Sequence, residues 1–200
     1  MARLLVIDTT SRFLSLALFD GGALIAHDHR DIGRGHAEAL LPAVAALPDG
    51  GIAQEIWVGC GPGSFTGLRI GIAAARALAF AWGASLRGFD SLALVAAAAR
   101  EAHGIDNFSI VCDAGHGEWL VANAPHDAQS LAPPDAVKVC QFLVAGERAA
   151  DLIAQRGSGH GFAASADSRA AMGIENAAFI DPPRSIYARA PDAAISGKGG

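Results

Sequence analysis

Hydrophobic residues in the first part of the chain recur with the two-residue period of a β-strand. Over 13–19 they alternate between the two faces of an extended segment, and 3–9 and 23–29 have a similar aliphatic character. The Asp-Gly-Gly sequence at 20–22 supplies a turn between the second and third segments, because glycine adopts positive φ without strain. We therefore expect three consecutive strands that form a β-meander.

A helical period replaces this alternation at His36. From there to Leu47 apolar residues recur at intervals of three and four, and the Pro-Asp-Gly-Gly sequence at 48–51 ends the helix. The elements that follow are expected to be a buried parallel strand over 55–59, a helix from a glycine-rich turn to about Trp82, a strand over 85–88 and a helix over 91–103.

The strand pattern restarts near Asn107. The second half is expected to contain strands over 108–112 and 118–122, a Pro-rich loop at 133–134, a strand near 142–144 and a helix near 149–156. These elements indicate an α/β fold with an N-terminal lobe over 1–104 and a smaller C-terminal lobe over 105–190. We expect the glycine-rich end, 191–200, to be disordered.

Composition and charge exclude several classes of function. Of the 200 residues, 52% are hydrophobic and only 6% aromatic, so we expect a core of small aliphatic side chains. A net charge of -5 disfavours autonomous binding to nucleic acid or to an anionic membrane. Arg76 interrupts the longest apolar run, which is too short to span a bilayer. Three widely spaced cysteines indicate buried thiols in a cytoplasmic protein, because they form no disulfide framework or zinc knuckle.

The most distinctive motif is the glycine-rich turn at 61–67, between a predicted strand and a predicted helix. Backbone amides at such a turn favour an anion, but the Gly-Lys-Ser/Thr of a phosphate-binding P-loop is absent. The alternative is structural: Ser64 caps the helix and the glycines permit a tight turn.

Two acidic strand ends, at Asp8 and Asp113, each precede a turn. Acidic strand ends that face one another across a cleft are typical of the duplicated actin/Hsp70-like nucleotide fold. In the first turn Thr9 and Thr10 leave no glycine for a phosphate to approach. The candidate anion- or nucleotide-facing residues are Asp8, Thr9, Gly61, Gly63, Ser64, Thr66 and Asp113.

Small residues form a second pattern, since Gly67, Gly71 and Ala75 recur every four positions along one helix face. This stripe permits close packing, either on the chain's own sheet or on another subunit.

The histidines suggest chemistry only weakly. His36 with Glu38 is a candidate metal pair, but a structural histidine at a helix start is the preferred interpretation. His27 and His29 are expected on a solvated strand face. His116, near Asp113 and Glu118, is a candidate proton-transfer group, although nothing around it supplies a nucleophile.

Four segments closely resemble the bacterial TsaB family, also called YeaZ. They are Ile7-Asp8-Thr9, His36 with Leu40-Leu41-Pro42, the run from Gly61 to Gly71, and Ile186-Tyr187-Ala188-Arg189. The resemblance implies an actin/Hsp70-like (ASKHA, ribonuclease H-like) fold with mixed sheets flanked by helices. It also implies a role in N6-threonylcarbamoylation of adenosine 37 in tRNAs that read ANN codons.

The resemblance implies that this chain is a pseudoenzyme, a non-catalytic partner of the glycoprotease-like paralogue TsaD. In that family TsaD carries the metal, on a His-x-x-x-His pair. The corresponding positions here are Asp90 and Leu94, so the resemblance implies no metal site and no catalytic residues. The interface with TsaD, or with a second copy when the chain is alone, is then expected to involve His36, Leu40, Leu41, Val44, Gly67, Ile70, Gly71 and Ala75. The resemblance further implies the ATPase TsaE as a partner, tRNA contact only through the complex, and no tightly bound cofactor, with ATP or ADP a candidate at the partner interface.

Three functions follow as hypotheses. The first is this scaffold subunit. The second is an ATP- or metal-dependent hydrolase of the same superfold, suggested by the two acidic strand ends and His36. The third, a stand-alone tRNA binder, is the weakest because the chain has no basic stripe.

Overall fold

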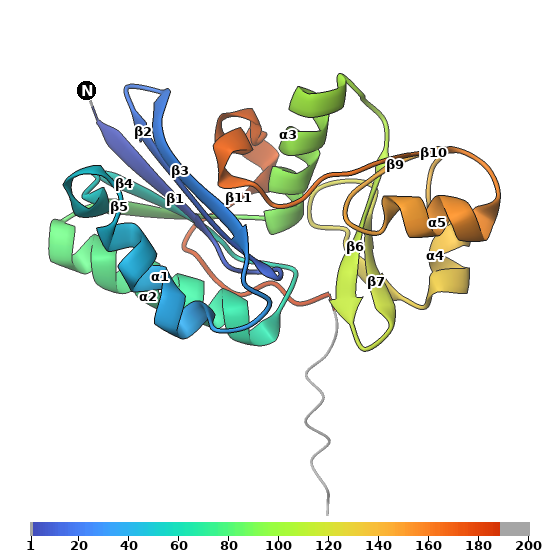
Figure 1. Ribbon diagram of the computed structural model, residues 1–200, viewed down its shortest axis with the longest axis horizontal. Helices are drawn as coiled ribbons and strands as arrows, with labels where there is room; N and C mark the ends of the chain where they lie inside the picture. Colours follow the sequence, from blue (N-terminus) through green and yellow to red (C-terminus); the bar gives the residue numbers. More distant parts are fainter. Residues whose placement is uncertain (1, 189–200) are drawn as a thin grey trace, which may run out of the picture.

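The computed structural model describes residues 2–188, and two β-sheets with helices between and outside them make up the molecule (Figure 1). The first sheet has the strand order β11-β5-β4-β1-β2-β3 and the second has the order β10-β9-β6-β7-β8. Helices α1 and α2 cover the outer face of the first sheet, α3 lies between the sheets, and α4 and α5 cover the second sheet (Figure 1). The predicted two-lobe α/β architecture is therefore confirmed.

The first lobe contains the strands and helices that the sequence pattern predicted and, in addition, a short 3₁₀-helix. They are β1 (Arg3–Asp8), β2 (Phe13–Asp20), β3 (Ala23–Asp31), α1 (His36–Ala45), the 3₁₀-helix η1 (Pro48–Gly51), β4 (Glu55–Gly59), α2 (Phe65–Trp82), β5 (Ser85–Phe89) and α3 (Ser91–His103). Strands β1, β2 and β3 pair antiparallel, and β4 joins β1 and β5 in parallel. The meander and the parallel strand are both confirmed.

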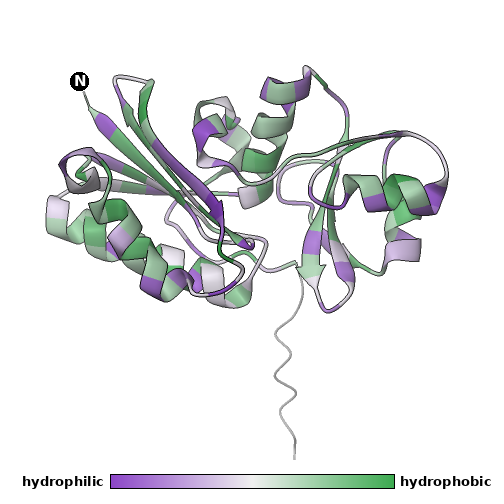
Figure 2. Cartoon of the chain, in the orientation of Figure 1, coloured by the Kyte–Doolittle hydropathy of each residue, from purple (hydrophilic) through white to green (hydrophobic). Residues whose placement is uncertain are grey.

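Both faces of the first sheet are buried, which explains why β2 has apolar residues at nearly every position. Leu14, Leu16 and Leu18 pack into the core beneath α1 and α2. Ala17 and Phe19 point the other way, into the core shared with α3 and the second sheet. Figure 2 shows hydrophobic colouring over much of this sheet, whereas the edge strand β3 is hydrophilic over its second half.

Helix α2 packs on this sheet through Leu68, Ile72 and Ala75. By length and composition alone it is apolar enough to cross a membrane, but a core helix meets the same criteria. Arg76 therefore does not exclude it on composition, contrary to the sequence-based expectation. Packing on the sheet buries 33% of the helix, and apolar residues on its other side stay exposed.

The second lobe is smaller and has short elements. They are β6 (Ser109–Gly115), β7 (Glu118–Ala122), β8 (Gln129–Leu131), α4 (Pro133–Val139), β9 (Leu143–Ala145), α5 (Ala149–Arg156) and β10 (His160–Phe162). Val111, Val121 and Leu152 form its own core beneath α4 and α5. The predicted loop at 133–134 is wrong, because the two prolines occupy the first turn of α4, where no intrahelical N–H is needed.

The chain then returns to the first lobe, so the predicted boundary of 105–190 for the second lobe is wrong. The returning segment contains the 3₁₀-helices η2 (Ser168–Gly173) and η3 (Asn176–Ala178) and the strand β11 (Phe179–Ile180). Strand β11 pairs antiparallel with β5 at the edge of the first sheet, and η2 packs against α3. The expected tail at 191–200 lies outside the described residues.

Candidate functional site

A cleft of about 650 Å³ separates the two lobes. Two strand-turn-strand corners flank it: the β1–β2 corner of the first lobe and the β6–β7 corner of the second. The start of α2 forms another part of its wall through Gly63, Ser64 and Phe65. If the candidate anion-facing residues bind a ligand, their side chains must line this cleft.

The β1–β2 corner buries its acidic residue. Asp8 is 1% exposed, and its Oδ1 accepts hydrogen bonds from the Thr10 amide at 2.9 Å and the Thr10 hydroxyl at 2.8 Å. Its Oδ2 is buried beside the Ser91 hydroxyl, and burial raises the pKa of Asp8 despite hydrogen bonds from Thr10 and Ser91. A Cβ at Gly59 would collide with this carboxylate. Asp8 therefore lies beneath the cleft and does not line it.

This corner rests directly on the start of α2. The Thr9 hydroxyl donates to the Gly67 carbonyl at 2.8 Å, and the Ser64 amide donates to the Thr10 carbonyl at 2.6 Å. A Cβ at Gly67 would overlap the Thr9 carbonyl, and one at Gly71 would overlap the Thr9 hydroxyl. The predicted stripe of small residues thus faces the chain's own first corner rather than another subunit.

Most of the predicted interface residues are buried inside the chain. His36, Leu40, Val44, Gly67, Gly71 and Ala75 all belong to this buried set. Leu41 is 52% exposed and Ile70 is partly exposed. The prediction chose the wrong face of each helix at these six positions, because periodicity identifies an apolar stripe without showing what covers it.

The glycine-rich turn is confirmed as a helix start. Ser64 is the N-cap of α2, and its hydroxyl accepts the Gly67 amide at 3.2 Å. Gly63 and Ser64 line the cleft, whereas Gly61 is buried beneath the Ile186 carbonyl. Thr66 is exposed but is not among the residues that line the cleft.

The β6–β7 corner keeps its acidic residue at the surface. Asp113 accepts the Gly115 amide at 2.8 Å and pairs with the Arg148 guanidinium at 2.8 Å. Burial alone would raise the pKa of Asp113, but the Gly115 and Arg148 hydrogen bonds outweigh it and lower the pKa. The expectation that both acidic strand ends face the cleft is therefore wrong, since only Asp113 lines it.

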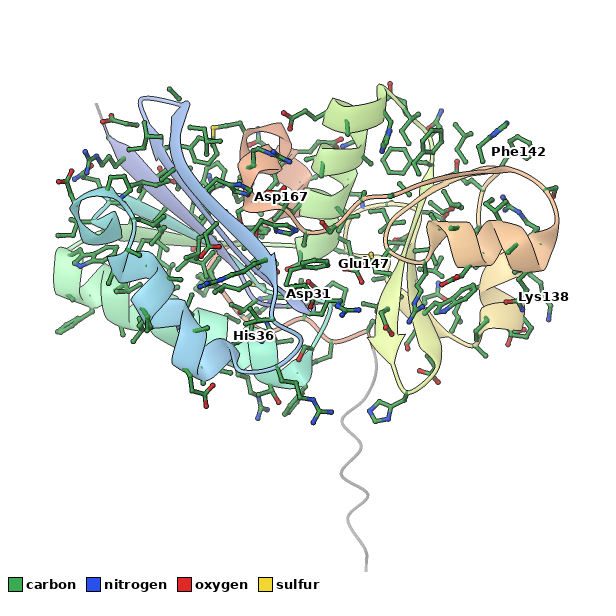
Figure 3. All side chains as sticks on the ribbon, viewed as in Figure 1. Asp31, His36, Lys138, Phe142, Glu147 and Asp167 are labelled. Atoms are coloured by element: carbon green, nitrogen blue, oxygen red, sulfur yellow. The ribbon has the colours of Figure 1, made fainter. Side chains whose placement is uncertain are left out.

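Several charged residues of the cleft were missed from the sequence. Glu147 follows β9 and approaches Asp113, and burial first and then Asp113 raise the pKa of Glu147. Arg12 pairs with Asp31 at 2.6 Å, whereas the Arg34 guanidinium has no ion pair among the described residues. Figure 3 shows Asp31 and Glu147 on the two sides of the gap.

One signal could have found Glu147. Strands β6 and β9 are parallel, so residues after β9 lie at the same edge as Asp113. Using this signal requires a prediction that β6 and β9 pair in parallel. Strand β9 has only three residues, which is too short a pattern to predict that pairing.

The histidines divide into structural and partly buried groups. His36 Nε2 lies 3.2 Å from the Phe13 carbonyl, which confirms its structural role at the start of α1. His116 lies at the exposed tip of the β6–β7 turn and lines the cleft. The predicted solvated face of His27 and His29 is wrong, because the returning segment covers part of β3 and places Asp167 against His27. Burial lowers the pKa of His29.

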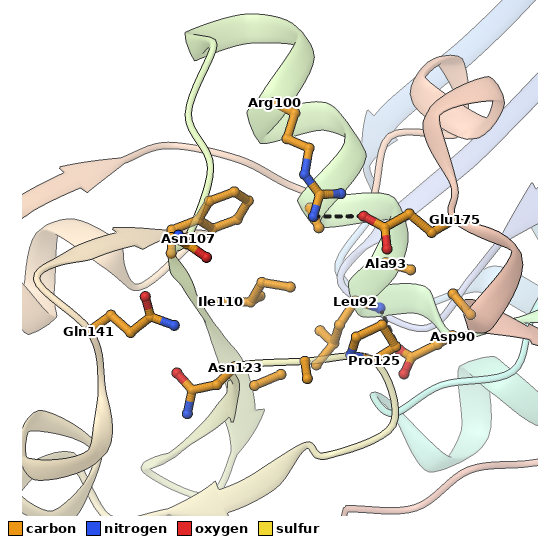
Figure 4. Close-up of a pocket in the computed structure, with 15 residues that line it drawn as sticks. Asp90, Leu92, Ala93, Arg100, Asn107, Ile110, Asn123, Pro125, Gln141 and Glu175 are labelled. Atoms are coloured by element: carbon orange, nitrogen blue, oxygen red, sulfur yellow. Dashed lines mark hydrogen bonds and ion pairs between the residues drawn. The ribbon is translucent and has the colours of Figure 1, made fainter.

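Asp90 and Leu94, the two positions for which the resemblance implied the loss of a metal site, have structural roles here. Asp90 caps α3 by accepting the Leu92 amide at 2.9 Å, and its other oxygen accepts the His126 amide at 2.9 Å. Leu94 is fully buried in the core. Asp90 also borders a second cavity of about 120 Å³ between α3 and the second sheet, and Arg100 pairs with Glu175 at 2.9 Å on one side of it (Figure 4).

Comparison with known proteins identifies the family. Residues 30–195 match the family described as TsaD, tRNA N6-adenosine threonylcarbamoyltransferase. The chain belongs to this family. Its relatives place it in the TsaB/YeaZ group: over 134 residues, 64% of this chain, it is 33% identical to the tRNA threonylcarbamoyladenosine biosynthesis protein TsaB of Escherichia coli. The Bacillus subtilis protein of the same name is 33% identical over 58% of the chain.

The solved structures support the same assignment. YeaZ from Pseudomonas aeruginosa superposes with a TM-score of 0.70 at 26% identity, covering 87% of this chain and 90% of that one. The ethanolamine utilization protein EutJ from Carboxydothermus hydrogenoformans has a TM-score of 0.50 at 12% identity, covering 87% and 89%, and shows the fold alone. These matches confirm the actin-like ASKHA fold. The alignments cover 58% and 52% of the two TsaB relatives, so the chain spans little more than half their lengths.

Proposed function

We propose that this chain is a non-catalytic scaffold subunit in the N6-threonylcarbamoylation of adenosine in ANN-decoding tRNAs, acting as a heterodimer with a TsaD paralogue. The observation that carries the proposal is the family match combined with the structural roles of Asp90 and Leu94. A capping carboxylate and a buried leucine cannot replace two histidines as metal ligands. The chemistry is therefore assigned to the partner.

The surface available for this partner is the outer face of α1 and α2, which we call the α1/α2 face and define by Leu41, Ala73, Ala77 and Phe80. All four side chains are exposed, and Phe80 is 92% exposed. An exposed patch of apolar residues on adjacent helices is typical of a protein interface. Arg69 and Phe65, in cation–π contact at 3.7 Å, extend this face towards the cleft.

The remaining partners stay predictions. A second copy of the chain would use the same α1/α2 face when TsaD is absent, and TsaE would join the assembled pair. The net charge of -5 supports delivery of tRNA by the partner rather than by this chain. A cytoplasmic location also stays a prediction.

Co-purification with the cognate TsaD tests the proposal. Ala73→Glu places a charge in the α1/α2 face without loss of helix propensity, so we expect a folded protein whose affinity for TsaD falls at least about tenfold. Ala154→Glu is the matched control, because Ala154 is exposed on α5 in the other lobe. A tRNA modification assay should lose activity with the first variant only.

The proposal would be abandoned if Ala73→Glu and wild type bound TsaD equally well, or if modification proceeded without this chain. The hydrolase alternative requires both acidic strand ends to reach a substrate, and the burial of Asp8 disfavours it. ATP or ADP at the partner interface stays a prediction. Calorimetry with each nucleotide, on the chain alone and on the complex, distinguishes an interface site from a hydrolase site within this chain.

A further inference from the structure

A cluster of two histidines and one aspartate lies at the edge of the first sheet, away from the cleft and the α1/α2 face. His27 and His29 come from β3, where a spacing of two residues places both side chains on one face. Asp167 comes from the segment that returns from the second lobe and is labelled beside η2 in Figure 3. One potential ligand atom from each residue lies within 4.8 Å of the others.

The ligand atoms of the cluster already lie close together. His27 Nε2 is 2.7 Å from Asp167 Oδ1, and the two imidazole rings are parallel, with centroids 6.1 Å apart. The side chain of Asp167 is only 12% exposed. A bound cation would therefore be held by buried or partly buried donors from two segments separated by 140 residues in the chain.

Hydrogen bonds behind the cluster orient its members. His29 Nδ1 lies 3.0 Å from the hydroxyl of Ser15, a fully buried residue whose oxygen also accepts the Ser168 amide at 2.8 Å. When Nδ1 carries the proton it donates to Ser15, and the Nε2 lone pair remains available on the other side of the ring. Metal-binding histidines commonly donate their second N–H in this way. Asp167 is oriented by the Arg169 amide and guanidinium, at 2.9 and 3.0 Å.

We propose that His27, His29 and Asp167 bind a zinc ion. Two imidazoles and one carboxylate are an established zinc ligand set, with water as the fourth ligand. Ser165, whose hydroxyl lies 3.2 Å from His29 Nε2, would turn away to make room. Such an ion fastens the edge strand β3 to the returning segment, so its role is to stabilise the packing of that segment on the first lobe. The proposal is independent of binding to TsaD.

Calorimetric titration of the full chain with zinc tests this site, using protein without a histidine tag and treated with a chelator. We expect one ion per chain, and at least about tenfold weaker binding in His27→Ala, His29→Ala and Asp167→Asn. His116→Asn is the control, because that exposed histidine has a positive φ, which asparagine tolerates, and should leave the affinity unchanged. Cobalt should give the visible spectrum of a four-coordinate ion in wild type and control.

A stability measurement separates metal binding from a purely structural role of the cluster. Binding to the folded state alone raises the melting temperature, so zinc should raise it by several degrees in wild type and in His116→Asn but not in His29→Ala. The absence of zinc binding by wild type would overturn the proposal. So would equal affinity, or an equal zinc-dependent rise in melting temperature, in all the variants.

Discussion

The two strand-turn-strand corners of this molecule begin alike and end in opposite environments. In each, an aspartate at the end of a strand accepts the amide two residues later, from Thr10 to Asp8 at 2.9 Å and from Gly115 to Asp113 at 2.8 Å. The first corner is packed onto α2, whereas the second is open to the cleft. Burial raises the pKa of Asp8, whereas hydrogen bonds from Gly115 and Arg148 overcome burial and lower that of Asp113.

This difference shows that the same local turn can be an anchor or part of a cleft wall. The first corner has threonines where an actin-like nucleotide site needs glycines, and the glycines lie instead in α2, which receives the corner. The close packing at this corner is therefore made within the chain itself. Substitutions at the two corners should therefore differ in their effect on stability.

The largest effect is expected from glycine substitution. Gly67→Ala should lower the free energy of unfolding by about 3 kcal/mol, because the added methyl group meets the backbone carbonyl of Thr9, which cannot move without shifting the corner. Gly115→Ala in the open corner should cost only about 1 kcal/mol, from its left-handed φ of 75°, since nothing lies within 4 Å. Urea denaturation measures both, and equal losses would contradict the contrast.

The next effect concerns the hydrogen bond that joins the first corner to α2. Thr9→Val keeps the shape of the side chain but removes the donor to the Gly67 carbonyl, and should cost about 1.5 kcal/mol. Thr66→Val is the control on the same helix, because Thr66 is exposed and its loss should change stability by less than about 0.5 kcal/mol. If the two variants unfolded at the same urea concentration, the Thr9 hydroxyl would not be an anchor.

The aspartates themselves should respond to pH with opposite signs. A raised pKa in the folded state makes the contribution of Asp8 greatest below the ordinary value of 3.8, and it is lost as pH rises through the folded value. Asp8→Asn removes this loss and keeps the acceptor for Thr10, so it should stabilise the protein at pH 7 by about 1 kcal/mol. The gain should grow with pH above 3.8.

The lowered pKa of Asp113 gives the reverse dependence. Its contribution is present above 3.8 and is lost as pH falls through the lower folded value. Because the ion pair with Arg148 is well exposed, Asp113→Asn should destabilise the protein at pH 7 by only about 0.5 kcal/mol. Urea denaturation from acidic pH to pH 7 measures the free energy of unfolding of both variants. If both substitutions stabilised the protein at pH 7, or both destabilised it, the proposed difference between the two corners would be wrong.

The first lobe could be predicted in detail because its elements carry strong local signals. Helix α3 begins and ends where the sequence predicted, with Asp90 as its N-cap and Gly104 in a left-handed conformation at its C-cap. The second lobe gave weaker signals: β8, β9 and β10 have three residues each, too few for a clear period. Strand β11 has two residues and exists only through its pairing with β5.

The candidate site was predicted less completely than the fold. The sequence identified Ser64 as a helix cap and Asp113 as a cleft residue, because both follow from turn chemistry next to a predicted strand. It did not find Arg34 or Glu147, which lie in no motif. The sequence also did not show which side of a helix is exposed to a partner: Gly71 was predicted in the interface and is buried.

Local sequence was enough to predict the order of the main elements, the chemistry of the turns and the family, since each depends on residues that are close together in the chain. Tertiary structure decided which of these residues are buried, and hence which are available for function. Thr9 meets Gly67, and His27 meets Asp167, across 58 and 140 residues. Contacts of this range determine solvation and charge, so a turn that looked like a ligand site became an anchor, and a strand expected in solvent became a candidate metal site.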